Sequence, residues 1–464
     1  MTAAAALSAS ATATTTAAAD RTQQLLHAPL LPTLLRLATP NVLGLFAMTL
    51  QIGYDGYILG RLGPHALAGV ALVLPLSMLM VQMSAGGIGG ATTAAVARAL
   101  GAGRAADAVQ LARHALLVGL AMAALFMLVL LGGGRPVYTA MGGRGAALDA
   151  ALAYSNVMFG GALAIWAVNV LAGIVRGAGN MVLPSLAMLG ATLAHLLLCP
   201  ALVFGWGPLP GLGVAGAALS TLTVNAVSAL VLAAALLRSG ATVPLRAGPW
   251  RTERAALAGI LRVGLPAALS PVISNGSIAA ATAVVGSYGT VALAGYGVAA
   301  RLEYILVPIA FGFGTALTTL VATNMGAGQM ARAVRAAWLG GALVAAITGG
   351  IGLTVALAPG LWMDMFTTDP DVRAQGMRYL RIVGASYGLF GLGLALFFAS
   401  QGAGRMLWPL VGSLARLFVV AVGGWVCVGW LQAPADAFYA VVAASLALYA
   451  AIIAGAIRLK GWAR

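Results

Sequence analysis

Charged residues are scarce in this sequence of 464 residues: Asp, Glu, Lys and Arg make up 8%, whereas hydrophobic residues make up 61%. A soluble globular protein carries about 25% charged residues, so this composition excludes a soluble fold. Runs of about 20 apolar residues, rich in Ala, Leu and Gly, have the length of a transmembrane helix. We therefore predict an all-α integral membrane protein that lies in a lipid bilayer.

Cysteine is nearly absent as well. The two cysteines, Cys199 and Cys427, both lie in apolar runs, and no CxxC pair occurs. This excludes a disulfide framework and provides no metal or redox motif, so the sequence predicts no metal site and no cofactor. The formal net charge of +15 comes from residues in short loops between apolar runs. It therefore does not indicate a nucleic-acid partner.

The beginning of the chain lacks the basic start and long apolar core of a secretory signal. It is instead rich in Ala, Thr and Ser, a composition that buries little apolar surface. We predict that residues 1–32 form a disordered cytoplasmic tail.

Residues 35–184 and 261–409 are two copies of one sequence repeat. Short motifs recur 226 residues later at first, and 225 residues later after a one-residue slip. The matched pairs include Leu67-Ala68-Gly69 with Leu293-Ala294-Gly295, Gly177-Ala178-Gly179 with Gly402-Ala403-Gly404, and Pro184 with Pro409. One register over so long a stretch indicates duplication of a large unit, which is how many secondary transporters are built.

Twelve apolar spans can be placed along the chain. They run near 33–58, 66–90, 108–132, 153–174, 183–205, 212–237, 257–286, 291–321, 334–358, 379–400, 407–431 and 436–458. Six is an even number, so both copies enter the membrane from the same side and form two parallel six-helix repeats (6+6) around a central cleft. We assign an N-terminal lobe to 33–237, a cytoplasmic linker to 238–256, a C-terminal lobe to 257–458 and a cytoplasmic tail to 459–464.

Basic residues are distributed unevenly over the two sides of this topology. Eighteen fall on the side that carries the termini and six on the other. Since cytoplasmic loops collect Arg and Lys, both termini are predicted to face the cytoplasm, in the inner (plasma) membrane.

Several ordered motifs resemble those of the multidrug and toxic compound extrusion (MATE) family. They are Asp55-Gly56-Tyr57-Ile58-Leu59-Gly60-Arg61-Leu62-Gly63, Arg98-Ala99-Leu100-Gly101-Ala102-Gly103-Arg104, Gly213-Val214-Ala215-Gly216-Ala217-Ala218-Leu219-Ser220-Thr221 and Asn324-Met325-Gly326-Ala327-Gly328. The DNA-damage-inducible F-like branch looks closest. The resemblance implies an antiporter, driven by H⁺ or Na⁺, that exports cationic amphiphilic molecules by alternating access and catalyses no covalent reaction. It also implies a monomer.

Of the ten acidic residues, only Asp55 and Glu303 fall within spans. A carboxylate inside the membrane is costly, so both are functional candidates. Asp55 lies toward the outer end of the first span and is either an interfacial aspartate near Arg61 or the ion-coupling group. Glu303 lies near the middle of the eighth span and either belongs to an ion pair or network that bridges helices, or binds a cation or a proton. Arg301, two residues earlier, is predicted to lie on a different helical face and not to pair with it directly. The position equivalent to Asp55 in the second copy is Ala281.

The fifth span departs from the family pattern. Many members of the branch carry Asn and then, four residues later, Asp before a proline, where this chain has His195 and Cys199. Histidine titrates near neutral pH, so we hypothesise that Asp55 and His195 together form the coupling pair. The alternative is a neutral histidine that is hydrogen-bonded in a packed helix.

Other polar residues in spans are further candidates for binding the ion or the substrate. Asn169, Asn275 and Gln51 either line a cavity or join helices by hydrogen bonds. Pro40 and Pro266 occupy equivalent places in the first span of each copy and are predicted to be hinges, because proline removes a helical hydrogen bond.

Two rival functions remain at this stage. A lipid-linked oligosaccharide flippase would need basic residues in its cavity, and Arg301 is the clear basic residue in a span. A passive channel would need a polar ring repeated in both copies, whereas the charged residues in the spans are asymmetric.

Overall fold

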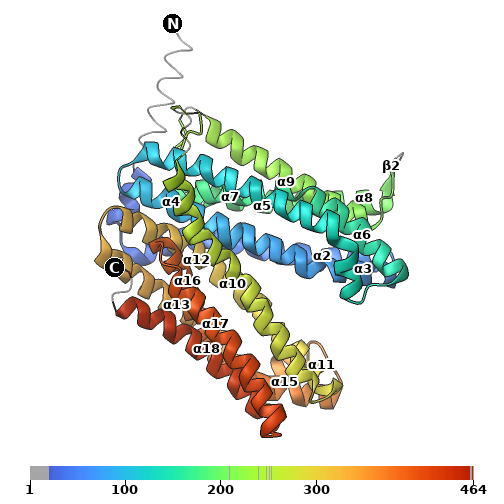
Figure 1. Ribbon diagram of the computed structural model, residues 1–464. Helices are drawn as coiled ribbons and strands as arrows, with labels where there is room; N and C mark the ends of the chain where they lie inside the picture. The colour runs from blue at the N-terminus through green and yellow to red at the C-terminus, as the bar shows by residue number, and fades with distance from the viewer. Residues whose placement is uncertain are drawn as a thin grey trace. The chain divides into compact units, whose positions relative to one another are not determined.

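The computed structural model describes residues 20–459 and Trp462, apart from residues 208, 239, 247, 250 and 252. The first copy forms these helices (Figure 1): α2 (Leu30–Gly60), α3 (Pro64–Gln82), the π-helix η1 (Met83–Gly89), α4 (Gly90–Gly101), α5 (Ala105–Ala140), α6 (Gly145–Gly160), α7 (Ala162–Gly177), α8 (Val182–Phe204) and α9 (Val214–Leu237). A two-stranded antiparallel hairpin, β1 (Gly205–Trp206) and β2 (Leu209–Pro210), joins α8 to α9.

The second copy repeats this order. Its elements are α10 (Arg254–Gly286), α11 (Thr290–Ala300), α12 (Glu303–Gly326), α13 (Met330–Leu357), α14 (Gly360–Met363), α15 (Pro370–Val383), the 3-10 helix η2 (Gly384–Ser386), α16 (Tyr387–Ala403), α17 (Leu407–Trp425), the π-helix η3 (Val426–Trp430) and α18 (Ala435–Arg458).

The predicted number of spans is confirmed. Among the described residues, eleven helical segments are long and apolar enough to cross a membrane, and α6 with α7, bent by 45° at one break, makes a twelfth. The second span is longer than predicted and runs over Pro64–Gly101, because the glycine-rich stretch continues as the π-helix η1 and then as α4.

The duplication is visible in matching tertiary contacts within each copy. Thr93 Oγ1 donates to the carbonyl of Gly173 at 3.0 Å, and Thr318 Oγ1 donates to the carbonyl of Phe398 at 3.0 Å, each pair 225 residues from the other. Gly177 lies against the backbone of Thr93, and Gly402 lies against the backbone of Thr318. The small residues shared by the two copies therefore mark the same close helix crossings.

The described chain divides into two compact units: one division lies just before α2, and the other two lie inside α2 and α10. Over the described residues, one unit comprises 20–28 and 39–268, and the other comprises 29–38 and the residues from 269 onward. The lobe change predicted in the linker therefore lies farther along the chain. The physical reason is that the first half of α10 packs on η1: a Cβ on Gly87 would lie 2.7 Å from Ala268 Cβ.

The predicted disordered tail is wrong for its described part. Residues 20–27 are helical, and α2 already begins at Leu30. Leu25 and Leu26 are buried, and the Leu25 side chain lies against Gly179. Burial of these two leucines contributes to ordering a segment whose average composition is typical of disorder. Residues 1–19 lie outside the described part.

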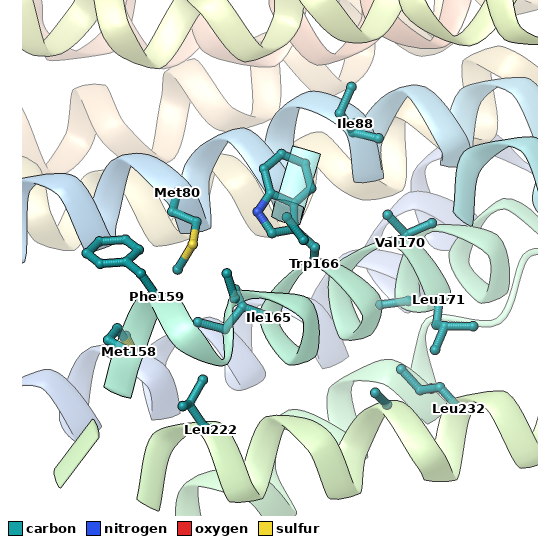
Figure 2. Close-up of a cluster of buried hydrophobic side chains, with 14 of the residues drawn as sticks. Met80, Ile88, Met158, Phe159, Ile165, Trp166, Val170, Leu171, Leu222 and Leu232 are labelled. Carbon is teal, nitrogen blue, oxygen red and sulfur yellow. The ribbon is translucent and has the colours of Figure 1, made fainter. Parts of the chain in front are cut away.

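The core of the first unit is aliphatic and aromatic. Figure 2 shows Trp166 of α7 between Met80 of α3, Ile88 of η1 and Phe159 of α6, which are all buried. Because membrane lipid is as apolar as these side chains, their shape and close packing hold the helices together.

The predicted linker 238–256 is packed against α5 over its described residues. Arg113 of α5, 7% exposed, donates to the carbonyl of Leu245 at 2.7 and 3.0 Å and to that of Pro249 at 3.1 Å. Val243 is fully buried. The linker therefore has a defined path on the first unit.

Candidate functional site

The α2 and α8 helices of the first unit are joined by a ladder of polar contacts. At one end Ser185 Oγ donates to Asn41 Oδ1 at 3.2 Å, and farther along Thr192 Oγ1 donates to Gln51 Oε1 at 3.4 Å. The ladder ends at Asp55. A polar row of this kind fixes which faces of two otherwise apolar helices meet.

Asp55 and His195 are brought into direct contact. His195 Nε2 lies 2.6 Å from Asp55 Oδ1; the imidazole is fully buried and the carboxylate side chain is 22% exposed. On its other side, His195 Nδ1 lies 2.9 Å from Ser220 Oγ of α9, which is also fully buried. The three side chains come from three helices, and the histidine is the central member.

A hydroxyl can either donate or accept, so Ser220 suits His195 in both of its charge states. When the ring is neutral and donates through Nε2 to the carboxylate, Ser220 donates to Nδ1. When the ring is charged, both nitrogens donate and Ser220 accepts. The arrangement can therefore gain or lose a positive charge without leaving a buried polar atom unpaired.

Cys199 completes the cluster. Its Sγ lies 3.7 Å from Asp55 Oδ1, and the side chain is fully buried. One ligand atom each from Asp55, His195 and Cys199 lies within 4.8 Å of the others. We call these three residues with Ser220 the α2/α8 cluster.

The order carboxylate, imidazole, hydroxyl is also that of a serine hydrolase. Here, however, Ser220 has no exposed surface, so no substrate carbonyl can reach its oxygen.

Glu303 lies in the second unit, at the first turn of α12. Tyr379 Oη donates to Glu303 Oε1 at 3.5 Å, and the carboxylate is partly buried. The Tyr379 ring makes edge-to-face contacts with Tyr296 and with Tyr439, with centroids 5.2 Å apart in each pair. This acidic group therefore lies beside a cluster of three buried tyrosines.

Arg301 was predicted to lie within the eighth span without pairing directly with Glu303, and it lies inside the candidate span Thr290–Gly326. The helix breaks after Ala300, and the exposed Arg301 guanidinium lies 5.8 Å from the centre of the Phe366 ring. A turn between the two residues points their side chains in different directions.

The three predicted polar residues differ in their surroundings. Asn169 donates to Ser84 Oγ of η1 at 2.8 Å, which joins α7 to η1, and to the carbonyl of Ile165 in its own helix at 3.0 Å. Gln51 belongs to the polar ladder, one turn before Asp55. Asn275 is exposed on α10.

Sequence reasoning missed Ser220 and Asn41. Ser220 lies in a run of small residues, and its spacing of 25 residues from His195 gives no hint of contact. Asn41 is 1% exposed in an apolar span, and the search that found Gln51 could have found it.

Comparison with known proteins agrees with this fold. The MatE family model matches the chain twice, over residues 40–201 and 266–426. The chain is similar to the FAD transporter of Shewanella oneidensis, with 27% identity over 85% of this chain and 87% of that protein. It is also similar to a probable multidrug resistance protein, NorM, of Pseudomonas aeruginosa, with 30% identity over 83% and 87%.

Solved structures match over nearly the whole length. Crystal structures of MATE in the straight and in the bent conformation, both 25% identical, give TM-scores of 0.86 and 0.85 over 95% of this chain and 98% of theirs. The two family matches have the spacing of the internal duplication. With twelve spans in two repeated copies, the chain belongs to the MatE family of multi-pass membrane transporters.

Proposed function

We propose that this transporter is an antiporter that exports small organic molecules in exchange for H⁺ or Na⁺, by alternating access. The observation that carries the proposal is the Asp55 carboxylate, which lies in a membrane span, contacts His195, and keeps 22% of its side chain exposed. A partly accessible carboxylate with a polar partner can take up a cation and release it again. The multidrug resistance name of the Pseudomonas relative supports drugs as substrates.

Cationic amphiphiles are the proposed substrate class. Glu303 supplies a partly buried negative charge in the second unit. A negative charge of this kind attracts organic cations. The name of the Shewanella relative supports a second candidate, the anionic dinucleotide FAD.

The test is export from membrane vesicles under separately imposed pH and Na⁺ gradients. Wild type is compared with Asp55→Asn, with ethidium and FAD measured in parallel. We expect export of ethidium under one of the gradients and a loss of more than about tenfold in Asp55→Asn. Asp149→Asn is the matched control, because Asp149 is exposed and pairs with Arg135 only at 3.8 Å. Export that ignores both gradients, or that survives in Asp55→Asn, would refute the proposal.

Hinge motion at Pro40 and Pro266 belongs to the same proposal. The chain crosses between the two compact units at two places near these prolines. One crossing, in α2, lies between residues 38 and 39, next to Pro40, and the other, in α10, lies between residues 268 and 269, close to Pro266. Proline lowers the cost of bending a helix there. Pro40→Ala is expected to slow export while substrate binding is retained; equal rates would contradict the hinge role.

We further propose that both termini face the cytoplasm, which the distribution of arginine supports. Reporter fusions at each end, active on one side of the membrane only, test this orientation.

A further inference from the structure

The α2/α8 cluster combines an oxygen, a nitrogen and a sulfur ligand in one place. From these donors we infer that Asp55, His195 and Cys199 bind a transition-metal ion of the zinc type. Hard ions such as Mg²⁺ or Ca²⁺ choose oxygen ligands alone, whereas Zn²⁺ and Co²⁺ accept carboxylate, imidazole and thiolate together. The mixed set therefore selects this class of ion.

Two of the distances between ligand atoms can be compared with those of a tetrahedral zinc site. His195 and Cys199 are one helical turn apart on α8 and present their side chains on the same face. With bonds of about 2.0–2.3 Å, ligand atoms around zinc lie roughly 3.2–3.8 Å apart. The distance of 3.7 Å from Cys199 Sγ to Asp55 Oδ1 already meets this range.

One adjustment is needed. His195 Nε2 and Asp55 Oδ1 lie at the hydrogen-bond distance of 2.6 Å. A metal replaces that hydrogen bond: the neutral ring then carries its proton on Nδ1, which donates to Ser220, and the unprotonated Nε2 binds the ion. The two ligand atoms move apart by about 0.6 Å to reach zinc ligand spacing. The Cys199 thiol releases its proton to solvent on binding, because the thiolate is the ligand.

The surroundings support a ligand role for His195. Ser220 Oγ contacts Nδ1 at 2.9 Å, which orients the ring and leaves Nε2 directed at the cluster. Metal-bound histidines commonly have such a partner on their second nitrogen. Three protein ligands leave a fourth position open, on the side where the Asp55 carboxylate is exposed.

A bound metal would neutralise the group that we assign to ion coupling. We therefore expect Zn²⁺ to inhibit export in competition with the coupling ion. This consequence rests on the proposed function, whereas the binding site itself does not.

The test uses the purified full-length protein without a polyhistidine tag, reduced with a phosphine, and titrated with Co²⁺ alone. Wild type is expected to bind one ion with the near-ultraviolet absorption of a thiolate–cobalt bond. Cys199→Ser should abolish that absorption, and His195→Gln should weaken binding by at least about tenfold. Cys427→Ser is the matched control, since Cys427 is the other buried free cysteine.

The inference fails if wild type shows no thiolate–cobalt band, or if the band persists in Cys199→Ser. It also fails if Cys427→Ser removes the band. Cys199→Ala provides a second variant, and elution as a single folded peak identifies variants that can be interpreted. Cobalt binding without any transport would refute only the antiporter, and transport without cobalt binding would refute only the metal site.

Discussion

The two copies of the duplicated unit share the same helix arrangement but differ at one set of equivalent positions, where the side chains are polar in the first copy and apolar in the second. In the first copy Asp55, His195 and Cys199 meet between α2 and α8. The equivalent residues of the second copy are Ala281, Val420 and Gly424 on α10 and α17, and all three are buried. Ala281 and Val420 belong to one apolar cluster with Phe438.

This difference shows how a duplicated fold can become asymmetric. The crossings of α4 with α7 and of α12 with α16 are matched, because the same small residues lie at both. The chemistry at the positions of Asp55, His195 and Cys199 differs. The second copy fills the space with apolar contacts, so a buried charge at this place belongs to the first copy alone.

The largest effect is expected from giving the second copy the acid of the first. Ala281→Asp puts a carboxylate among apolar side chains and should destabilise the protein by about 3 kcal/mol, because the membrane interior offers it no partner. Thermal unfolding in detergent measures the change, with Ala281→Ser as the size control. An unchanged midpoint would mean that the apolar cluster is open to water.

The reverse exchange gives the first copy the residue of the second. His195→Val leaves the Asp55 carboxylate and the Ser220 hydroxyl without their shared partner, and should cost about 1–3 kcal/mol. Gradient-driven export should be lost at the same time. Leu197→Val, on the exposed face of the same helix, is the control. Full export by His195→Val would show that the histidine is not needed for coupling.

Equivalent glycines at the helix crossings of the two copies should be equally sensitive to substitution. A Cβ on Gly177 would lie 2.8 Å from the Thr93 carbonyl, and one on Gly402 would lie 2.6 Å from the Thr318 carbonyl. Gly177→Ala and Gly402→Ala should each destabilise by about 1–3 kcal/mol, measured by thermal unfolding. Gly190→Ala, with open space around it, is the control. A clear difference in destabilisation between the two variants would show that the two helix crossings are not packed alike.

The smallest effect is expected at the matched threonines. Thr93→Val and Thr318→Val each remove one hydrogen bond between helices, worth about 0.6 kcal/mol in a membrane protein. Thr49→Val removes only a bond within its own helix and provides the baseline. The two variants should shift the unfolding midpoint by the same small amount. A shift in one alone would show that the two hydrogen bonds do not contribute equally to stability.

Much of the candidate site could be anticipated from particular residues. Asp55 was identified because it is an acid in an apolar span, and His195 because it departs from the family pattern. The structure places the two 2.6 Å apart, and their role in coupling stays a prediction. The place of Arg301 within a span was anticipated, but hydropathy does not show that the helix breaks at that residue or that its guanidinium lies near Phe366.

The sequence by itself determined the class of protein, the duplication and the number of spans, because hydropathy and repeated small residues are properties of the chain read in order. Tertiary structure alone decided that Ser220 of α9 contacts His195, that Asn169 faces Ser84, and that Leu25 is buried. A membrane helix is apolar nearly all round, so its pattern does not set its rotation. Packing against neighbouring helices sets it, and so selects which of the rare polar groups meet.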